Sequence, residues 1–210
     1  MESPGFVALY ESRLWRRGWL LGLLLRIPFE AELERVSAAL NVVDDDLVLD
    51  LGCGTGIHSR PLARQAARGS VVGVDLSVAM VRRAVQLAAR EGLPNTLFVR
   101  GDAQSIPLPS DRVNAVCCCG ALHLFPDASL ALREMYRVLR PGGRIAIATF
   151  RRRGGTLSEA VTRIRRTLTG MDAYLPEDLE ERLRQTGFTR VSRYHAGGVW
   201  LIVGASKEAA

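Results

Sequence analysis

A glycine-rich run and an aspartate beyond it form a pattern that suits an adenosine-containing ligand. Gly52, Gly54 and Gly56 alternate with other residues, and a glycine, which has no Cβ, lets the backbone turn tightly and come close to a ligand. Backbone amides at the start of a helix after such a turn bind an anionic group, either a carboxylate or a phosphate. Asp75 follows roughly 20 residues later, a spacing at which a carboxylate accepts hydrogen bonds from both ribose hydroxyls.

A third polar segment, Gly101-Asp102-Ala103, adds an acceptor for a nucleobase. The Asp102 carboxylate is placed to accept a hydrogen bond from an exocyclic amine such as N6 of adenine. A glycine-rich turn alone is common and carries little information. The three segments in combination predict a bound adenosyl cofactor with an anionic tail.

Each of these segments directly follows a short apolar run, which predicts a strand. The predicted strands are 47–51, 71–75, 96–100, 113–119 and 144–150, and the helices between them are 57–67, 78–91 and 127–139. Ser77 is the expected N-cap of the second helix, and Pro141-Gly142-Gly143 ends the third. Strands that alternate with helices indicate a parallel sheet covered on both faces, with ligands beyond the strands' carboxyl ends.

The flanking segments follow a different pattern. We expect helices at 9–27, 29–40, 157–168 and 176–186, and two final strands at 190–195 and 199–204. The short link Ala196-Gly197-Gly198 predicts a hairpin, so these last two strands should be antiparallel. The chain is expected to form one domain over 1–210: a helical lid at 1–43, a cofactor-binding core at 44–150, and acceptor-side helices with the hairpin at 151–210.

A nicotinamide-binding dehydrogenase is the main rival to this interpretation. Its fingerprint is G-x-G-x-x-G, and Ile57 stands where the third glycine of that pattern would be. A Tyr-x-x-x-Lys pair is also absent, because Lys207 is the only lysine. Both observations favour a different adenosyl cofactor.

Four segments together resemble the class I S-adenosylmethionine (SAM)-dependent methyltransferases. They are Val48–Gly56, Val72–Ser77, Gly101–Ala103 with Ile106–Leu108, and Leu132–Gly143. The resemblance covers about residues 44–150 and implies a three-layer, Rossmann-like α/β fold with a seven-stranded, mostly parallel sheet and an antiparallel last strand. It implies SAM as the cofactor and S-adenosylhomocysteine as its product, and it implies no metal.

The resemblance also implies roles for individual residues. Asp75 would hold the ribose, Asp102 and the Ala103 amide the adenine, and the carbonyls near Cys119 and Gly120 the methionine amine. The full predicted cofactor-binding set is Tyr10, Asp50, Gly52, Cys53, Gly54, Gly56, Asp75, Leu76, Met80, Gly101, Asp102, Ala103, Cys119 and Gly120. One departure is Val113-Asn114, where the family usually has Phe-Asp; an asparagine keeps a hydrogen bond there and loses the charge.

The charge and cysteine content of the chain limit the classes of partner that we expect. The 210-residue chain carries a net charge of +6, but it lacks a basic run with interleaved aromatics, so we expect no nucleic acid as partner. Three of the four cysteines are consecutive, which fits neither a disulfide framework nor a metal site and suggests reduced thiols in the cytoplasm. The start of the chain lacks the basic region of a signal peptide, and the apolar run 18–25 is shorter than a membrane span.

The acceptor is expected to be an apolar or amphipathic small molecule. The motifs of DNA amino-methylating and base C5-methylating enzymes are absent, and adjacent cysteines do not suit arsenic methylation. Residues 121–127 loosely resemble the branch that includes quinone, sterol-like and natural-product methyltransferases. Alternatives are a phospholipid or quinone methyltransferase at a membrane surface and a non-catalytic SAM-binding regulator. The expected acceptor-side residues are Trp15, Trp19, His123, Phe150 and Tyr174.

His123 is the candidate catalytic base, because it follows the fourth strand at the rim of the cofactor site. The alternative is that it only shapes the pocket. His58 is expected to be a surface or packing residue.

The apolar N-terminal segment has three interpretations: a helix packed on the core, a lid that excludes water from the cofactor, or a contact with a membrane surface through Trp15, Trp19 and neighbouring arginines. The chain is expected to be a monomer or a homodimer.

Overall fold

The computed structural model describes residues 27–155 and 171–209. The predicted helix at 157–168 and nearly all of that at 9–27 lie outside these residues. The elements, in chain order, are α3 (Phe29–Leu40), β1 (Leu47–Leu51), α4 (Ser59–Gln65), β2 (Ser70–Asp75), α5 (Val78–Arg90), β3 (Thr96–Arg100), β4 (Val113–Cys119), η1 (Leu122–Leu124), α6 (Ala128–Val138), β5 (Leu139–Phe150), α8 (Pro176–Thr186), β6 (Thr189–Gly197) and β7 (Trp200–Ser206).

The strands form one seven-stranded sheet in the order β3-β2-β1-β4-β5-β7-β6. Strands β1 to β5 pair in parallel, whereas β7 pairs antiparallel with both β5 and β6. The predicted α/β sheet with an antiparallel last strand is therefore confirmed. The predicted hairpin is also confirmed, with β7 inserted between β5 and β6.

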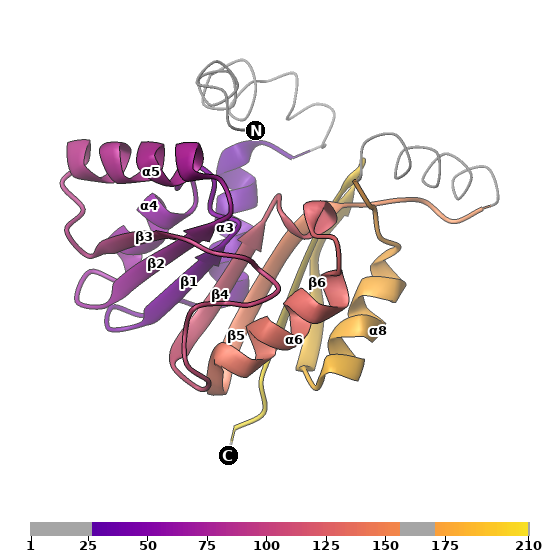
Figure 1. Ribbon diagram of the computed structural model, residues 1–210. Helices are drawn as coiled ribbons and strands as arrows, with labels where there is room; N and C mark the ends of the chain where they lie inside the picture. Colours follow the sequence, from indigo (N-terminus) through magenta and orange to yellow (C-terminus); the bar gives the residue numbers. More distant parts are fainter. Residues whose placement is uncertain (1–26, 156–170, 210) are drawn as a thin grey trace.

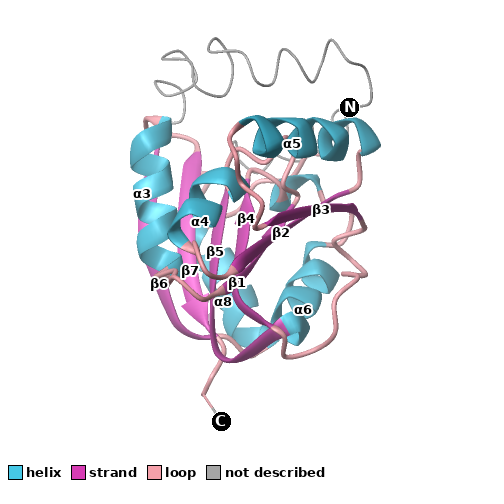
Figure 2. Cartoon of the chain, turned by 90° about the vertical axis from the view of Figure 1, so that its left-hand side faces the viewer, coloured by secondary structure: helices cyan, strands magenta, loops and turns pink. Residues whose placement is uncertain are grey.

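Helices cover both faces of the sheet. In Figure 1, α6 and α8 lie in front of the sheet and α3 lies behind it; Figure 2 shows α3 and α6 on opposite sides of the strands. The α6/α8 face buries Leu49, Leu132 and Leu183 in one apolar cluster. The α3 face buries Val36 and Leu62 in another.

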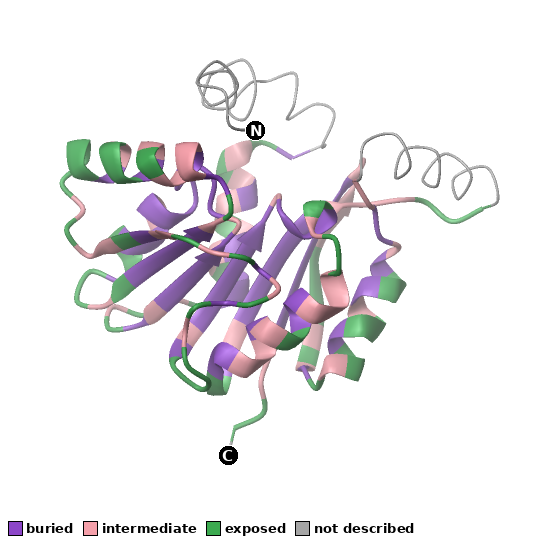
Figure 3. Ribbon diagram, viewed as in Figure 1, coloured by how far each residue is buried: buried purple, intermediate pink, exposed green. Residues whose placement is uncertain are grey.

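Burial explains why the strands are apolar throughout. Figure 3 shows the strands as the most buried part of the molecule and exposed residues on the outer helix surfaces. In β1, Leu49 and Leu51 pack on the α6/α8 face, whereas Val48 packs on the α3 face. A strand buried on both faces cannot alternate apolar and polar residues, which is the pattern of parallel sheets between helix layers. Asp50 is the exception in β1, and it is only 2% exposed.

Local signals fix several helix ends. The Ser77 side chain accepts a hydrogen bond from the Met80 amide, which confirms it as the N-cap of α5. Asp127 caps α6 in the same way through the Leu130 amide. Helix α8 has Pro176 in its first turn and ends at Gly187, whose φ of 109° is readily adopted by a residue without Cβ.

The predicted bounds of the described elements agree within two residues except at the start of β5, and two of the differences have a clear cause. The helix expected at 57–67 is the shorter α4, because the glycine turn extends through His58 before the helix begins. The strand expected to begin at Arg144 begins at Leu139 and includes Pro141-Gly142-Gly143. Leu139 pairs with Val113, and a register shift between Val113 and Ala115 accommodates the extra residues, so the proline and glycines form an irregularity within the strand.

Candidate cofactor and acceptor site

The site lies where the order of strands switches. Strand β1 has β2 on one side and β4 on the other, with Asp50 level with Gly73 and Cys117. The loops that leave the carboxyl ends of these strands therefore meet at one edge of the sheet. That edge is where open parallel sheets bind ligands.

The glycine loop after β1 requires glycine for two reasons. Gly52, Gly54 and Gly56 have φ angles of 70°, 54° and 75°, in the left-handed region that favours glycine. A Cβ on Gly52 would also lie 2.3 Å from the Ala121 Cβ. The loop is held against β2, because the amides of Gly52 and Cys53 both donate to the Val74 carbonyl.

Asp75 faces the glycine loop. Its carboxylate accepts from the Gly54 amide at 2.8 Å and from the Ser77 amide at 2.9 Å. Burial raises the pKa of this carboxyl group, while the two backbone hydrogen bonds act in the opposite direction. The structure therefore brings together the loop and the aspartate that the sequence analysis linked.

The neighbours of Asp75 differ in exposure. Leu76 is 63% exposed, so its side chain offers an apolar surface beside the carboxylate. Met80 is 4% exposed and lies inside the fold. Of these two predicted cofactor residues, Leu76 is accessible to a ligand at the rim.

Asp50 lies beneath the loop. Its carboxylate accepts a hydrogen bond from Ser59 Oγ at 2.5 Å, so it holds the start of α4. Burial raises its pKa, whereas the nearby His58 and the Ser59 hydroxyl lower it. His58 is a packing residue, 2% exposed, with Nε2 3.1 Å from Glu32 Oε1.

Arg60 is a second support of the loop. Its Nη1 donates to the Thr55 carbonyl at 2.7 Å, and its Nε pairs with Glu91 at 2.8 Å. The sequence analysis missed Arg60 and Ser59. Their spacing within a helical turn after the last glycine is the signal that could have shown them.

The loop after β3 presents Asp102. Gly101 donates its amide to the Asp75 carbonyl, which fixes the loop beside β2. Asp102 is exposed, and its Oδ1 accepts from the Gln104 amide at 2.9 Å in a tight turn. Ala103 is buried at 8% exposure, so the turn is seated in the core while the carboxylate points outward.

Cys119 is the last residue of β4, and the segment after it carries Gly120 and His123. Gly120 has a φ of 72°, and its amide donates to the Ala148 carbonyl. His123 is 5% exposed, and its Nδ1 lies 3.2 Å from Thr149 Oγ1. The His123 ring centroid is 4.5 Å from that of Phe150.

The two remaining predicted acceptor residues that the structure describes lie on opposite faces of the sheet. Tyr174 packs in the cluster on the α6/α8 face, whereas Phe150 packs on the α3 face. Tyr174 meets Phe150 through the backbone, by donating its amide to the Phe150 carbonyl. Tyr10, Trp15 and Trp19 lie outside the described residues. Asn114 keeps the expected hydrogen bond, since its Oδ1 accepts from the Leu47 amide at 3.0 Å.

Comparisons with known proteins agree with this geometry. A family model described as a methyltransferase domain matches residues 48–143. A demethylmenaquinone methyltransferase of Deinococcus radiodurans is 32% identical over 180 residues, which are 73% of this chain and 73% of that protein. The chain belongs to the class I SAM-dependent methyltransferases.

Other relatives differ in length. An uncharacterized chloroplastic methyltransferase of Arabidopsis thaliana is 36% identical over 154 residues, which cover 71% of this chain and 42% of that protein. Matches to the first curated relatives span about half of their length or less. The crystal structure of a SAM-dependent methyltransferase from Aquifex aeolicus shares the fold, with a TM-score of 0.73, 22% identity, and coverage of 98% of this chain and 99% of that one.

The chain's own residues suit the family's cofactor. The absence of a Cβ at Gly52 lets the glycine loop pack directly against Ala121, in the segment after β4, with its backbone in the left-handed region. Asp75 and Asp102 supply acceptors at the next two strand ends. A methyltransferase site of this class needs both features: a close backbone for the amino-acid end of SAM and acceptors for its adenosine.

Proposed function

We propose that this methyltransferase transfers the methyl group of SAM to an apolar or amphipathic small molecule, with a quinone-like ring as the favoured class. The observation that carries the proposal is the meeting of the glycine loop, Asp75 and the Asp102 turn at one edge of the sheet. His123, which is buried, and the partly buried Phe150 lie beyond β4 and at the end of β5, and together they supply an aromatic wall for the acceptor. The names of relatives such as the Deinococcus protein support a quinone.

The cofactor roles follow from position and exposure. The loop 52–56 would hold the methionine carboxylate through backbone amides. Asp75 would accept from the ribose hydroxyls, with Leu76 beside the adenine face. Asp102 and the Ala103 amide would hold the adenine edge, and the carbonyls near Cys119 and Gly120 would accept from the methionine ammonium group.

Methyl transfer from SAM needs no covalent bond between the protein and the methyl group. SAM, when bound, supplies a methyl group on a sulfonium sulfur that a nucleophile displaces in line. The chain's contribution is to hold the acceptor beside that methyl group and to keep water out, which supplies much of such a rate enhancement. A base is needed only where the acceptor must lose a proton.

Calorimetry with SAM and with S-adenosylhomocysteine tests the cofactor part of the proposal. We expect micromolar or tighter binding of both to the full chain. An assay for S-adenosylhomocysteine release with quinols, phenols and phospholipids then tests the acceptor. Absence of binding would contradict the whole proposal. Binding without turnover on any acceptor would favour the alternative of a SAM-binding regulator.

His123 is tested separately, because two roles are open to it. Its Nδ1 contact with Thr149 means that a base would act through Nε2. For a base, His123→Ala should lower kcat by roughly 10²- to 10⁴-fold and flatten the acid limb of the pH–rate profile. For a wall residue, His123→Ala should raise KM for the acceptor and leave that limb in place.

Membrane contact remains a separate proposal, as does the monomeric or dimeric state. Within residues 27–155 and 171–209, every helix is too short or too polar to span a bilayer. We propose peripheral contact through the segment containing Trp15 and Trp19. Flotation with anionic liposomes tests it, and failure to float at low salt would rule it out.

A further inference from the structure

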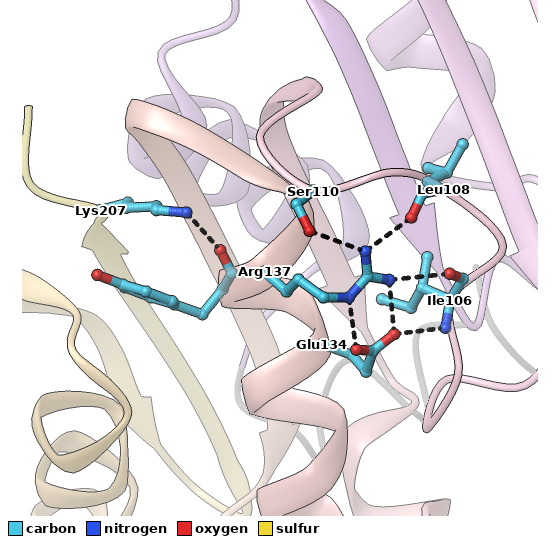
Figure 4. Close-up of polar contacts among 7 residues, drawn as sticks. Ile106, Leu108, Ser110, Glu134, Arg137 and Lys207 are labelled. Carbon is cyan, nitrogen blue, oxygen red and sulfur yellow. Dashed lines mark hydrogen bonds and ion pairs between the residues drawn. The ribbon is translucent and has the colours of Figure 1, made fainter. Parts of the chain in front are cut away.

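The loop that presents Asp102 is held by two side chains of α6. Arg137 donates from Nη1 to the Leu108 carbonyl at 2.9 Å and to Ser110 Oγ at 3.4 Å. From Nη2 it donates to the Ile106 carbonyl at 3.0 Å. One guanidinium group therefore bonds to three successive points along the loop (Figure 4).

Glu134 completes this arrangement. Its Oε2 accepts from the Ile106 amide at 2.8 Å, and its two oxygens accept from Arg137 at 2.6 and 2.8 Å. Both backbone polar groups of Ile106 are thus bonded to side chains of one helix. Hydrogen bonds to ionised groups are about twice as strong as neutral ones, and Arg137 and Glu134 each satisfy the charge of the other. We call Glu134 and Arg137 the α6 clamp.

The clamped residue is coupled directly to the Asp102 turn. Ser105 donates its amide to the Asp102 carbonyl, and Ile106, the next residue, is 4% exposed in the core. Gln104, which donates its amide to the Asp102 carboxylate, accepts through its side chain from the Asp127 amide at the start of α6. The turn is therefore tied to both ends of α6.

The rest of the loop has few bonds of its own. Its far end is fixed by Lys207, which pairs with Asp111 at 2.7 Å and donates to the Tyr136 and Leu139 carbonyls. Between Asp102 and Asp111 the loop is neither helix nor strand, apart from one isolated bridge. Without the clamp, the Ile106 amide would lose its partner, and the Ile106 carbonyl would keep only the Leu108 amide. A buried donor left without a partner costs free energy unless the loop moves.

We propose that Glu134 and Arg137 are positioning residues that set the affinity for the adenine end of the cofactor, because they fix the turn that presents Asp102. The inference rests on the proposed function, in which Asp102 accepts from the adenine amine. A ligand contact on a loop is tight only when the loop is already ordered in its binding geometry. Removal of the clamp leaves Asp102 in the chain and takes away its fixed position.

Calorimetry with S-adenosylhomocysteine tests the proposal on the full chain. We expect Arg137→Gln and Glu134→Gln to raise Kd roughly 10-fold, and Arg137→Lys to lie between them and the wild type, because one ammonium group cannot span the same acceptors. Arg193→Gln is the matched control, because Arg193, on β6, also bonds two glutamates, Glu177 and Glu180 of α8. It should leave Kd unchanged.

A second ligand shows whether the clamp variants lose the position of Asp102 or only lose folding stability. S-inosylhomocysteine carries an oxygen in place of the adenine amine, so its exocyclic group is an acceptor and cannot donate to Asp102. The wild type should prefer the adenosyl ligand, and the Glu134→Gln variant should lose most of that preference even where its thermal stability matches the control. If the preference persists, or if Kd is unchanged in the clamp variants, the proposal is wrong. If the wild type binds neither ligand, the proposed function fails instead.

Discussion

Asp75 is a partly buried carboxylate with a proposed role in cofactor binding, so the affinity for SAM should depend on pH. Its carboxylate must be ionised to accept from two hydroxyls, yet burial raises its pKa above the ordinary value of 3.8. We therefore expect SAM affinity to fall as the pH is lowered through this raised pKa. Asp75→Asn should bind about 10- to 100-fold more weakly at neutral pH, the cost of lost bonds to a charged group. Its affinity should lack this part of the pH dependence.

Folding stability provides the control for this prediction. An aspartate whose pKa is higher in the folded state than in the unfolded state takes up its proton more readily when folded. Its contribution to stability therefore rises as the pH falls from above the folded pKa towards the unfolded one. The affinity loss and the stability change from Asp75 have opposite signs. Equal pH profiles of affinity for the wild type and Asp75→Asn would exclude this carboxylate from the cofactor site.

Addition of one methyl group at Gly52 tests whether the glycine loop requires a residue without Cβ. Gly52→Ala combines a φ of 70° with a Cβ 2.3 Å from Ala121. Gly92→Ala is the matched control, because its φ is 65° and its Cβ would meet nothing within 4 Å. We expect urea denaturation to show a loss of about 1 kcal/mol for Gly92→Ala and about 1–3 kcal/mol more for Gly52→Ala. Only Gly52→Ala should weaken SAM binding; equal losses in both variants would contradict the close approach.

At the scale of elements, α3 is joined to the segment after the glycine loop by a buried pair. Glu32 and His58 are 1% and 2% exposed, with 3.1 Å between Oε1 and Nε2. Removal of one partner of a buried pair is costly because the other is left buried. We expect Glu32→Leu to lower the free energy of unfolding by about 3 kcal/mol, measured by urea denaturation.

A double-mutant cycle gives this prediction its control. Glu32→Leu with His58→Phe should cost less than the sum of the two single changes, because neither side chain of the pair is then left facing an apolar replacement. Asp44→Ala, which breaks the exposed pair with Arg68, should cost under about 1 kcal/mol. Additive losses at Glu32 and His58 would show that the pair is not coupled.

The elements that could be predicted from sequence are those with local signals. Strands β1 and β3 and helix α3 have the predicted bounds, because local patterns specify them. A short apolar run between polar turns specifies each strand, and apolar residues at helical spacing specify the helix. The start of β5 could not be predicted, because Pro141-Gly142-Gly143 is a breaker in isolation. It joins a strand only because Leu139 finds Val113 as a partner in the folded sheet.

The candidate site also contains residues that the sequence predicts and residues that it does not. The glycine loop and Asp75 could be predicted, because a few consecutive residues specify the turn and a few specify the strand that ends at Asp75. The α6 clamp was not, because Glu134 reaches Ile106 across 28 positions of the sequence. Nothing in the sequence distinguishes Arg137 from the other arginines. Its contacts depend on the folded arrangement, in which α6 lies against the loop after β3.

At the scale of the molecule, the sheet order explains why both halves of the chain build one site. The glycine loop and Asp75 come from the β1–β2 half, and His123 and the α6 clamp come from the β4–β5 half. Within the sheet, these halves are joined by the β1–β4 pair. The apolar cluster on the α6/α8 face spans both halves, with Val72 and Val74 from one and Ile145 and Ile147 from the other. We therefore expect the site and the fold to be lost together.

The four cysteines report on this cooperativity because they lie in different parts of the core. Cys118 faces the α6/α8 side, Cys117 and Cys119 face the α3 side, and Cys53 packs near α5. All four are buried. Burial raises the thiol pKa of Cys53 and Cys118, and that of Cys117 is raised by its contact with Cys119 and by burial. Reactive thiolates should therefore be scarce in the native protein.

Labelling with Ellman's reagent at pH 8 should consequently be slow for all four thiols in native buffer and complete in denaturant. Their rates should agree, because each thiol reacts only when the shared core opens. SAM at about 100 times its Kd should slow labelling roughly 100-fold, since only the folded state binds it. Mass spectrometry of the labelled peptides assigns each rate. One thiol that reacts fast in native buffer, with the other three protected, would show that its part of the sheet opens independently of the site.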